Sequence, residues 1–464
     1  MSTAPAQGRL VIVVAVLAST VAFLDGTIVN VALPQIANEL GGGLPVQQWV
    51  IDSYTLTLAA FILTAGALSD TFGRVTVLRV GLFAFGATSI ACALAPDSTS
   101  LIVLRALQGL AGALLVPSSL ALIASAFRGA AQTRAIGLWS AWTSAAFIGG
   151  PVLGGVLVDT VGWRWVFGVN VLPVVVTLVF LALLRKEQTS RGGKVDIVGA
   201  VLGALGLGGA VFALIEQGQL GWTHPLIIVS ALIGVAALAG FVVWEKRSPH
   251  PMMPLAMFRV RNFWVGNLTT FLVWGVLWLG VFIVPVFLQQ VAGYSGSIAG
   301  LATAPMTVIS LVISGAVGTL AGRWGPRWFV AIGPVIAAAG YLWMTSVSDP
   351  VNIWTSIVPG VLLVGTGIAI TSTPVTSTVL NAIPAAEAGI ASAVNNAVAR
   401  VAGLIAIAMV GTITGGVLDY DAFRRVVVFV AVVMVIGAGV AAFGIRNPIA
   451  TSLSSAQTPA GQPS

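Results

Sequence analysis

The sequence predicts an all-α polytopic membrane protein, built from two six-helix bundles with two further helices inserted between them. Of its 464 residues, 58% are hydrophobic and only 8% are charged, whereas soluble domains carry roughly 25% charged residues. The mean hydropathy is +1.02. The hydrophobic residues form about fourteen runs of about 20 residues, the length at which a helix crosses a bilayer. The runs are grouped along the chain as six, two and six.

The first six predicted spans make up an N-terminal bundle, which we assign to residues 1–190. They run approximately over Val11–Leu33, Gln48–Leu68, Thr76–Leu94, Leu101–Ala124, Ala135–Val158 and Val166–Leu184. The charged segment Arg185–Lys194 follows them and is the clearest predicted linker. The N-terminus lacks the pattern of a cleaved signal peptide, so we expect the first span to be retained.

The remaining spans complete the predicted architecture. Val195–Ile215 and Pro225–Trp244 form the inserted pair, which we assign to residues 191–250. The C-terminal bundle, residues 251–447, has spans at approximately Phe263–Leu288, Ile298–Leu320, Trp328–Trp343, Val351–Ser372, Ala388–Ile413 and Val426–Ile445. Residues 448–464 are rich in Ser, Thr, Pro and Gln and are predicted to be a disordered cytoplasmic tail.

Basic residues orient these spans. Lys and Arg gather in the cytoplasmic loops of membrane proteins, and with the N-terminus inside only Arg164, Arg424 and Arg425 fall in outer loops. We therefore expect a multi-pass protein of the cell membrane, a bacterial inner or plasma membrane, with both termini in the cytoplasm. The formal charge of +7 reflects this orientation, and no nucleic-acid partner is expected.

The composition argues against several other functions. The chain has one cysteine, Cys92, and two histidines, His224 and His250, so we expect no disulfide framework, zinc site or haem site. It has no Gly-rich phosphate-binding motif of the ATPase type. We expect no enzymatic activity and no cofactor, and any energy that the protein uses must come from an ion gradient.

The stretch Leu24–Pro34 places a carboxylate, Asp25, well inside the first span. A charged Asp near the centre of a membrane helix costs roughly 2.5–3.5 kcal/mol on insertion scales, so such residues usually face a bundle interior or a wet cavity. Because an apolar environment favours the neutral form of a carboxyl group, Asp25 is a candidate proton carrier. The alternative is a structural Asp that only pairs with a neighbouring helix.

Two more ionisable residues are predicted at a similar depth. Arg105 on the fourth span and Asp52 on the second each lie about one turn inside the outer helix end, and Asp25 lies about two turns down. The three could form one cluster, in which the guanidinium keeps the carboxylates ionised until a conformational change releases them to bind protons. A purely structural ion pair is the alternative.

Two glycine-rich motifs indicate conformational change. Gly66–Arg74 follows the second span, and the related segment Gly318–Gly325 follows the second span of the last six. Internal repeats of this kind are common in transporters. The fifth span contains Gly150–Pro151 and Gly154–Gly155, which predict close helix packing together with a proline kink.

These motifs resemble those of the major facilitator superfamily, and the fourteen-span plan resembles its drug:proton antiporter branch. The matching segments are Leu24–Pro34, Gly66–Arg74, Arg105–Gly109, Gly150–Gly155, Trp163–Phe167 with Asn170, Gln289, Gly293–Ser295, Gly300, Pro305 and Gly389–Arg400. Together they extend over nearly the whole chain. The chain departs from the family at Ala146, where the fifth-helix motif usually has Gly, and at Gly322, which replaces Asp70 in the second loop copy. Gating chemistry is therefore assigned to the first copy only.

The resemblance implies the major facilitator fold and roles for individual residues. It implies proton coupling for Arg105, together with Asp25 and Asp52. At the cytoplasmic gate, Asp70 and Arg74 would lock the closed state by a charge at a helix end, unless they are an ordinary solvated loop pair. The gating residues implied by the two glycine motifs are Gly66, Asp70, Gly73, Arg74, Gly150, Pro151, Gly154 and Gly155.

Aromatic residues on the first span of the C-terminal bundle are candidates for substrate contact. Phe271, Trp274 and Trp278 share one helix face near mid-span. They either pack against a neighbouring helix or lipid, or they wall a pocket for an apolar or cationic ligand. Further candidates are Asn30, Gln289 and Asn396, although we favour packing for Asn396.

The combined prediction is proton-coupled efflux of small hydrophobic or cationic drugs or antibiotics across the cytoplasmic membrane. The protein would work by alternating access, as a monomer in the lipid bilayer, with protons and small molecules as its partners. A dedicated exporter of one metabolite or antibiotic would carry the same motifs. The intramembrane acid disfavours a non-transporting sensor or lipid-handling protein, and the fifth-span motif, which resembles exporters, disfavours an importer on this fold.

Overall fold

The computed structural model describes residues 5–184, 196–249, 251–384 and 387–447, and all regular elements in these ranges are helical. The N-terminal helices are α1 (Pro5–Leu40), α2 (Gly43–Phe72), α3 (Arg74–Ala93), α4 (Ser98–Ala113), α5 (Leu115–Ala126), α6 (Gly129–Thr160), α7 (Arg164–Gly168) and α8 (Val171–Ala182). The middle elements are α9 (Ile197–Leu220), α10 (Pro225–Arg247) and the short η1 (Leu255–Arg259). The predicted linker Arg185–Lys194 and the tail 448–464 lie outside the described residues.

The C-terminal helices follow the same pattern of long helices with short breaks. They are α11 (Arg261–Gln290), α12 (Gly296–Trp324), α13 (Arg327–Trp343), η2 (Met344–Ser346), η3 (Ile353–Ile357), α14 (Val358–Asn381), α15 (Ala388–Ala408), α16 (Val410–Thr414) and α17 (Tyr420–Gly444). The all-helical prediction is therefore confirmed for the described chain.

Twelve helical segments among the described residues are long and apolar enough to cross a membrane. They include both helices of the inserted pair, α9 and α10. Two more helices, α2 with 30 residues and α6 with 32, exceed the length of about 20 residues that a span requires. Some side chains of α2 and α6 lie outside the described part of the structure.

Several predicted spans are interrupted helices rather than continuous ones. The span predicted over Leu101–Ala124 consists of α4 and α5, separated at Leu114, where the amide donates to the Ala111 carbonyl three residues back. Such tighter bonds mark helix ends. The span predicted over Ala388–Ile413 likewise divides into α15 and α16. Hydropathy does not register breaks of this kind, because the residues on either side are equally apolar.

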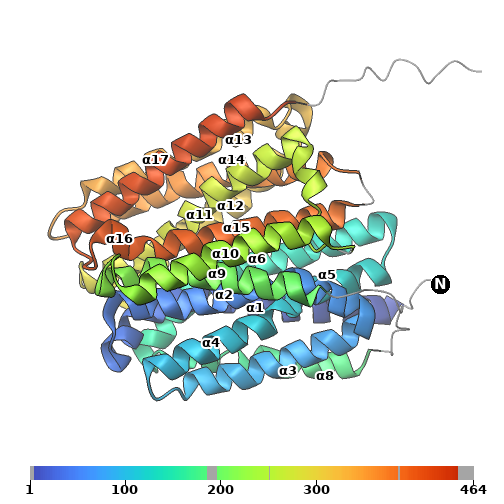
Figure 1. The fold of residues 1–464 in the computed structure, drawn as a ribbon, viewed down its shortest axis with the longest axis horizontal. Coiled ribbons are helices and arrows are strands. Elements are labelled where there is room, and N and C mark those ends of the chain that lie inside the picture. The colour runs from blue at the N-terminus through green and yellow to red at the C-terminus, as the bar shows by residue number, and fades with distance from the viewer. Residues whose placement is uncertain (1–4, 185–195, 250, 385–386, 448–464) are drawn as a thin grey trace, which may run out of the picture.

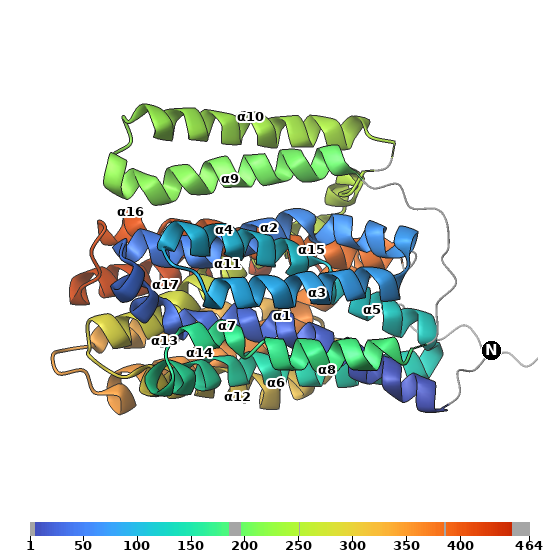
Figure 2. The same ribbon diagram turned by 90° about the horizontal axis from the view of Figure 1, so that it is seen from below.

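The helices form two groups, with the inserted pair on one flank. Figure 1 shows α13, α14 and α17 on one side of the molecule and α3, α4 and α8 on the other. In Figure 2, α10 is outermost and α9 lies between it and the remaining helices. Helix α9 contacts both groups, because Trp49 of α2 donates to Glu216 at 2.7 Å and Gln217 donates to Thr412 of α16 at 2.7 Å.

The apolar core differs between the two ends of the molecule. We call the end at which α1 finishes and α4 begins the outer end, since it is the predicted external side, and the opposite end the inner end. Towards the outer end, one buried cluster contains residues of both groups, among them Ile36 of α1 and Phe287 of α11. Towards the inner end the clusters are separate, with Val14 in one and Phe263 in another. Among the described residues, the buried cluster that both groups build lies at the outer end, while at the inner N-terminal cluster the C-terminal group contributes the partly buried Ala397 of α15.

Candidate functional site

Asp25 and Arg105 form an ion pair inside the N-terminal group. Asp25 lies on α1 and Arg105 on α4, and Arg105 Nη1 donates to Asp25 Oδ2 at 2.6 Å. Both residues are fully buried. Helices α4 and α2 approach closely at Gly109, where a Cβ would lie 2.1 Å from the carbonyl oxygen of Tyr54. The structure thus brings together two of the three residues predicted for proton coupling.

Three neutral polar side chains complete the surroundings of Asp25. Gln108 Nε2 and Asn170 Nδ2 donate to Asp25 Oδ1 at 3.2 and 2.8 Å. Ser89 Oγ accepts from the same two amides at 2.8 and 3.2 Å. With Arg105, the carboxylate has three side-chain donors, and charge-assisted bonds of this kind are the strong ones. The sequence analysis did not assign Ser89, Gln108 and Asn170 this role; polar residues within apolar spans were the available signal.

Arg105 is held by further contacts on α2 and α4. Its Nε donates to the carbonyl oxygen of Val50 at 3.0 Å, and its Nη1 also donates to Gln108 Oε1 at 2.8 Å. The guanidinium carbon lies 4.2 Å from the centre of the Tyr54 ring, a distance at which a cation is attracted to the aromatic face. The guanidinium therefore connects α1, α2 and α4 at one point.

Asp52 lies apart from this network. It is fully buried on α2, and neither carboxylate oxygen has a hydrogen-bond partner in the described structure. Trp49 and Leu56 precede and follow it by three and four residues, and both contact α9: the Trp49 ring lies 6.1 Å from that of Phe212, and Leu56 packs at Gly208. Residues at this spacing share a helix face. Gln48, four residues before Asp52, donates to the carbonyl oxygens of Ile407 and Ala408 of α15. Asp52 therefore lies on the side of α2 that meets α9 and α15, and the expected three-residue cluster is a pair.

Helix α6 packs closely against α1 through two of the predicted glycines. A Cβ on Gly150 would lie 2.0 Å from Thr27 Oγ1, and a Cβ on Gly154 would lie 2.6 Å from the Ile28 carbonyl oxygen. Distances below 3.0 Å require something to shift. At these positions the approach of the two backbones leaves no room for a side chain.

The same helix also contacts the C-terminal group. A Cβ on Gly155 would lie 2.4 Å from the carbonyl oxygen of Gly296, and a Cβ on Gly300 would lie 2.2 Å from the carbonyl oxygen of Pro151. Both Gly296 and Gly300 belong to α12. The glycine-rich part of α6 therefore joins the two groups.

Asp159 extends this contact at the outer end of α6. Its carboxylate accepts hydrogen bonds from the backbone amides of Gly296 at 3.0 Å and Ser297 at 2.8 Å. The first amides of a helix have no partner within the helix and form its positive end. A carboxylate of the N-terminal group thus caps a helix of the C-terminal group. The sequence analysis did not single out Asp159.

The loop motif Gly66–Arg74 occupies a sharp junction between α2 and α3. Gly73 has a φ of 90°, which favours glycine because it has no Cβ. A Cβ on Gly66 would meet no atom within 4 Å, so close packing does not explain that glycine. Arg74 begins α3. The side chain of Asp70 lies outside the described residues, so the predicted interaction between Asp70 and Arg74 lies outside them as well.

A cavity of about 410 Å³ lies between the two groups. Trp274 and Trp278 of α11 line it together with Asn396 and Arg400 of α15. Phe23 and Trp139 line it from α1 and α6. Phe271, which was predicted to share the lane of Trp274 and Trp278, is not among the lining residues. The two tryptophans therefore have the position expected of a pocket wall.

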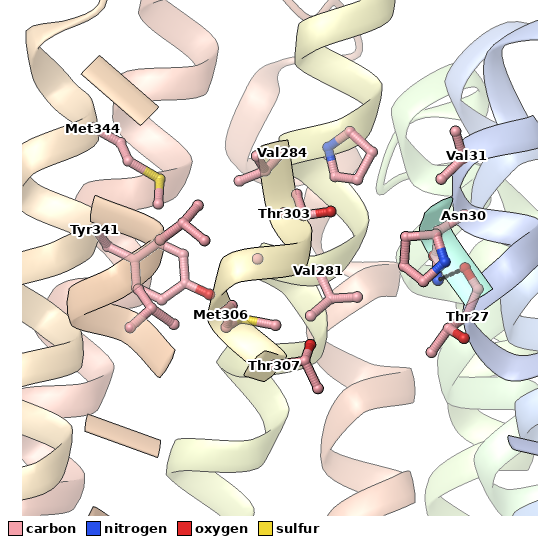
Figure 3. A pocket seen from close by; sticks show the side chains of 15 residues that line it. Thr27, Asn30, Val31, Val281, Val284, Thr303, Met306, Thr307, Tyr341 and Met344 are labelled. Carbon is pink, nitrogen blue, oxygen red and sulfur yellow. Dashed lines mark hydrogen bonds between the residues drawn. The ribbon is translucent and has the colours of Figure 1, made fainter. Parts of the chain in front are cut away.

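Asn30 and Gln289 lie closer to the outer end. Asn30 lines a small pocket of about 30 Å³, and Figure 3 shows Thr27 and Asn30 on one side of it and Tyr341 and Met344 on the other. The Asn30 amide donates to the carbonyl oxygens of Gly26 and Thr27 in its own helix, each at 3.3 Å. Gln289 of α11 instead donates to the Val31 carbonyl oxygen of α1 at 3.0 Å, so it bonds the two groups to each other.

The arrangement corresponds to that of a known transporter family. The model of the Major Facilitator Superfamily matches residues 15–407. The chain belongs to this superfamily. It is therefore a membrane transporter rather than an enzyme, and the predicted family is confirmed.

Several relatives within the superfamily are named for drug or antibiotic resistance. Multidrug resistance protein Stp of Mycobacterium tuberculosis (strain CDC 1551 / Oshkosh) is 36% identical, over 84% of this chain and 73% of that protein. Puromycin resistance protein pur8 of Streptomyces alboniger is 33% identical, over 87% and 81%. Multidrug export protein EmrB of Escherichia coli (strain K12) is 30% identical, over 86% and 80%.

Solved structures of the superfamily share the fold at low sequence identity. A bacterial homologue of the human lysosomal transporter Spinster, in an inward-facing and unoccupied conformation, superposes with a TM-score of 0.70 at 16% identity, over 95% of this chain and 98% of that one. A peptide transporter in complex with sulfate gives a TM-score of 0.68 at 16% identity, over 94% and 93%. These likenesses show the fold alone.

Proposed function

We propose that the protein exports small hydrophobic compounds, drugs or antibiotics among them, in exchange for protons. The observation that carries the proposal is the fully buried ion pair of Asp25 and Arg105, 2.6 Å apart. Charged side chains at this depth are expensive and mark proton or substrate pathways in transporters. The relatives named for multidrug resistance and export support the direction of transport.

The surroundings of Asp25 suggest how a proton would change the structure. Arg105, Gln108 and Asn170 all donate to the carboxylate, so a proton bound there would weaken three hydrogen bonds at once. A proton from outside would remove the negative charge and leave Arg105 as a buried cation without a counter-charge, which costs several kcal/mol. The protonated protein would relieve this cost by rearranging α1 against α4.

Alternating access would use the contact between α6 and α12. With the predicted orientation, the shared apolar cluster closes the external side and the separate inner cores leave the cytoplasmic side divided, which is an inward-facing state. The close glycine approaches and Asp159 would hold that state. We infer that Gly66, Asp70, Gly73 and Arg74 form the opposite lock, which closes the cytoplasmic side in the outward-facing state.

We further infer that the protein crosses the membrane fourteen times. The twelve candidate spans together with the long helices α2 and α6 support this number. The spans would be divided into bundles at 1–190 and 251–447, with the inserted pair at 191–250 and the tail at 448–464. Both termini would lie in the cytoplasm, and one chain would be the functional unit.

Proton movement in everted vesicles tests the function. Vesicles energised to an acidic interior should release protons when an exported compound is added outside, because the compound enters the everted vesicle as protons leave. We expect this release with the native chain and with Asp25→Glu, which keeps a carboxyl group, and no release with Asp25→Asn. Normal proton-driven transport by Asp25→Asn would overturn the role of Asp25. Absence of release with the native chain across a broad panel of cationic, neutral and anionic compounds would overturn the antiport.

A further inference from the structure

The charge of the central cavity is opposite to that expected for a site for cationic drugs. Among the described residues that line the cavity of about 410 Å³, Arg400 is the one charged side chain. The same residue also lines a smaller neighbouring cavity of about 40 Å³, together with Arg105. The charged lining of both spaces is therefore positive.

Arg400 has no counter-charge in the described structure. Its Nε is buried without a hydrogen-bond partner, and none of the ion pairs includes it. Of the 14 acidic residues in the chain, Asp25 and Asp52 are the ones that fall deep inside predicted spans. Asp25 is paired with Arg105, and Asp52 makes no hydrogen bond or ion pair with Arg400 in the described structure. The positive charge of Arg400 is thus left for a molecule that enters the cavity.

The remaining walls favour a flat apolar molecule with a few polar groups. Trp274 and Trp278 present rings from α11, and Phe23 and Trp139 present rings from α1 and α6. Aromatic rings pack well against aromatic ligands. Among the other lining residues, the hydroxyls of Thr143, Thr307, Ser310 and Ser372 offer additional hydrogen-bonding groups.

We propose that Arg400 binds the acidic group of the exported compound, so that the preferred substrates are aromatic molecules bearing a carboxylate or an ionised hydroxyl. A guanidinium presents several donors in a planar arrangement that matches a carboxylate. A cationic drug in the same cavity would meet a like charge, which is unfavourable. This inference rests on the proposed export function and names its substrate class.

The substrate charge also changes how transport responds to the membrane potential. For the same number of protons taken in, export of a monoanion moves two more positive charges inward than export of a monocation. Movement of charge across the membrane couples transport to the potential. An interior-negative potential should therefore accelerate export of the anion more than that of the cation.

Binding of two probes with the same ring system and opposite charges tests the proposal. Pyrenebutyrate and pyrenylbutyl-trimethylammonium each carry a pyrene ring on a short alkyl chain, and both can be titrated into the purified full chain in lipid nanodiscs. We expect the native protein to bind the carboxylate at least tenfold more tightly than the ammonium compound. Arg400→Gln should lose this preference, whereas Arg400→Lys should keep most of it. Arg79→Gln, which removes a positive charge from an exposed position on α3, should bind both probes as the native protein does.

Two results would overturn the proposal. One is tighter binding of the ammonium probe by the native chain, and the other is an unchanged preference in a folded Arg400→Gln protein, as judged by its melting temperature and gel-filtration profile. Proton release in vesicles separates this inference from the export function. If cationic compounds drive proton release and anionic ones do not, the substrate class is wrong and antiport stands. If the carboxylate binds through Arg400 and no compound drives proton release, antiport is wrong and the binding site stands.

Discussion

At the residue scale, the buried charged side chains differ in whether they have partners within the apolar interior. Arg105 has a carboxylate, two further acceptors and an aromatic face around it, whereas Arg400 has no hydrogen-bond partner for its Nε in the described structure. Asp25 accepts hydrogen bonds from three side chains, whereas Asp52 has no hydrogen-bond donor among the described residues. The compensated pair suits a switch that changes with a proton, and the uncompensated Arg400 suits ligand binding.

The pairing of Asp25 with Arg105 could be predicted from the sequence, because opposite charges inside neighbouring spans have few other partners. The position of Asp52 could not be predicted from depth alone. Residues that lie at a similar depth can face different neighbours, because a shift of a few residues turns a side chain to another side of the helix. The neighbours of Asp52 depend on how α9 packs on α2, and the residues of these two helices do not indicate that packing. Ser89, Gln108 and Asn170 were visible only as polar residues in apolar runs.

The tryptophans of the cavity should determine which compounds are exported. We expect Trp274→Ala to reduce the export rate of large aromatic compounds more than that of small ones, because it removes part of the cavity wall. Phe271→Ala is the matched control, since Phe271 lies one turn away on the same helix and does not line the cavity. Export rates for a panel of compounds of graded size check this. If the export rate depends on compound size in the same way in both variants, Trp274 has only a packing role.

Asp97 offers a pH-dependent test of how α4, which carries Arg105, is held. Asp97 accepts hydrogen bonds from the backbone amide and the hydroxyl of Ser100, each at 2.8 Å, and these bonds lower the pKa of its carboxyl group. The stability gained is therefore fully present above the ordinary pKa of about 3.9 and is lost as the pH falls through the lowered native pKa.

We accordingly expect Asp97→Ala to melt at a lower temperature than the native chain at pH 7, with a difference that shrinks towards pH 3. Asp97→Asn should lose less at pH 7, because Asn is also a good N-cap, and its difference from Asp97→Ala should not change with pH. Thermal unfolding of the purified protein measures both. A difference between Asp97→Ala and the native chain that is constant with pH would contradict this account of the cap.

At the scale of elements, the fold depends on α6 being able to approach both α1 and α12. The glycine spacing on α6 predicted a packing face, and the structure adds which helices occupy it: α1 at Gly150 and Gly154, and α12 at Gly155. The sequence does not indicate which partner meets which glycine, because α12 lies in the other half of the chain. The helix breaks at Leu114 and Met409 were also not predicted, since no Pro or Gly stands at either position.

Substitution of Gly155 should disturb transport more than substitution of Gly149. A methyl group on Gly155 would lie 2.4 Å from the Gly296 carbonyl oxygen, whereas a methyl group on Gly149 would meet no atom within 4 Å. We expect Gly155→Ala to lower the export rate at least tenfold, while Gly149→Ala stays close to native. Vesicle transport at matched expression levels measures this. Comparable rates in the two variants would show that the close approach of α6 and α12 is not required.

At the scale of the whole molecule, the shared outer core and the separate inner cores are features of one of the two conformations that alternating access requires. Exchange between states requires the outer contacts to open as the inner ends close. Asp159 and the first turn of α12 lie where this opening must begin. The sequence predicted the family and the span map over most of the chain, but not the state, because both states use the same helices and differ only in how the two groups meet.

Spin labels can follow this exchange at both ends. Because the native chain has a single cysteine, Cys92, a Cys92→Ser background accepts one label pair at Thr160 and Ser295 and another at Phe72 and Trp324. We expect acidification to shorten the outer distance and lengthen the inner one, because a proton that Asp25 binds from outside has to be carried into the inward-facing state. Distances measured by double electron–electron resonance should then move in opposite directions. Movement of both pairs in the same direction would contradict alternating access.

The most direct test of the central claim is the proton released when substrate binds to the purified protein. In weakly buffered solution, with a compound that the vesicle assay shows to be exported, the native chain should release protons on binding, with Asp25 as their source. Asp25→Asn should bind the same compound without release, and Asp52→Asn should release as the native chain does. Undiminished proton release from Asp25→Asn would contradict the account. If Asp52→Asn alone abolished the release, Asp52 would be the coupling residue.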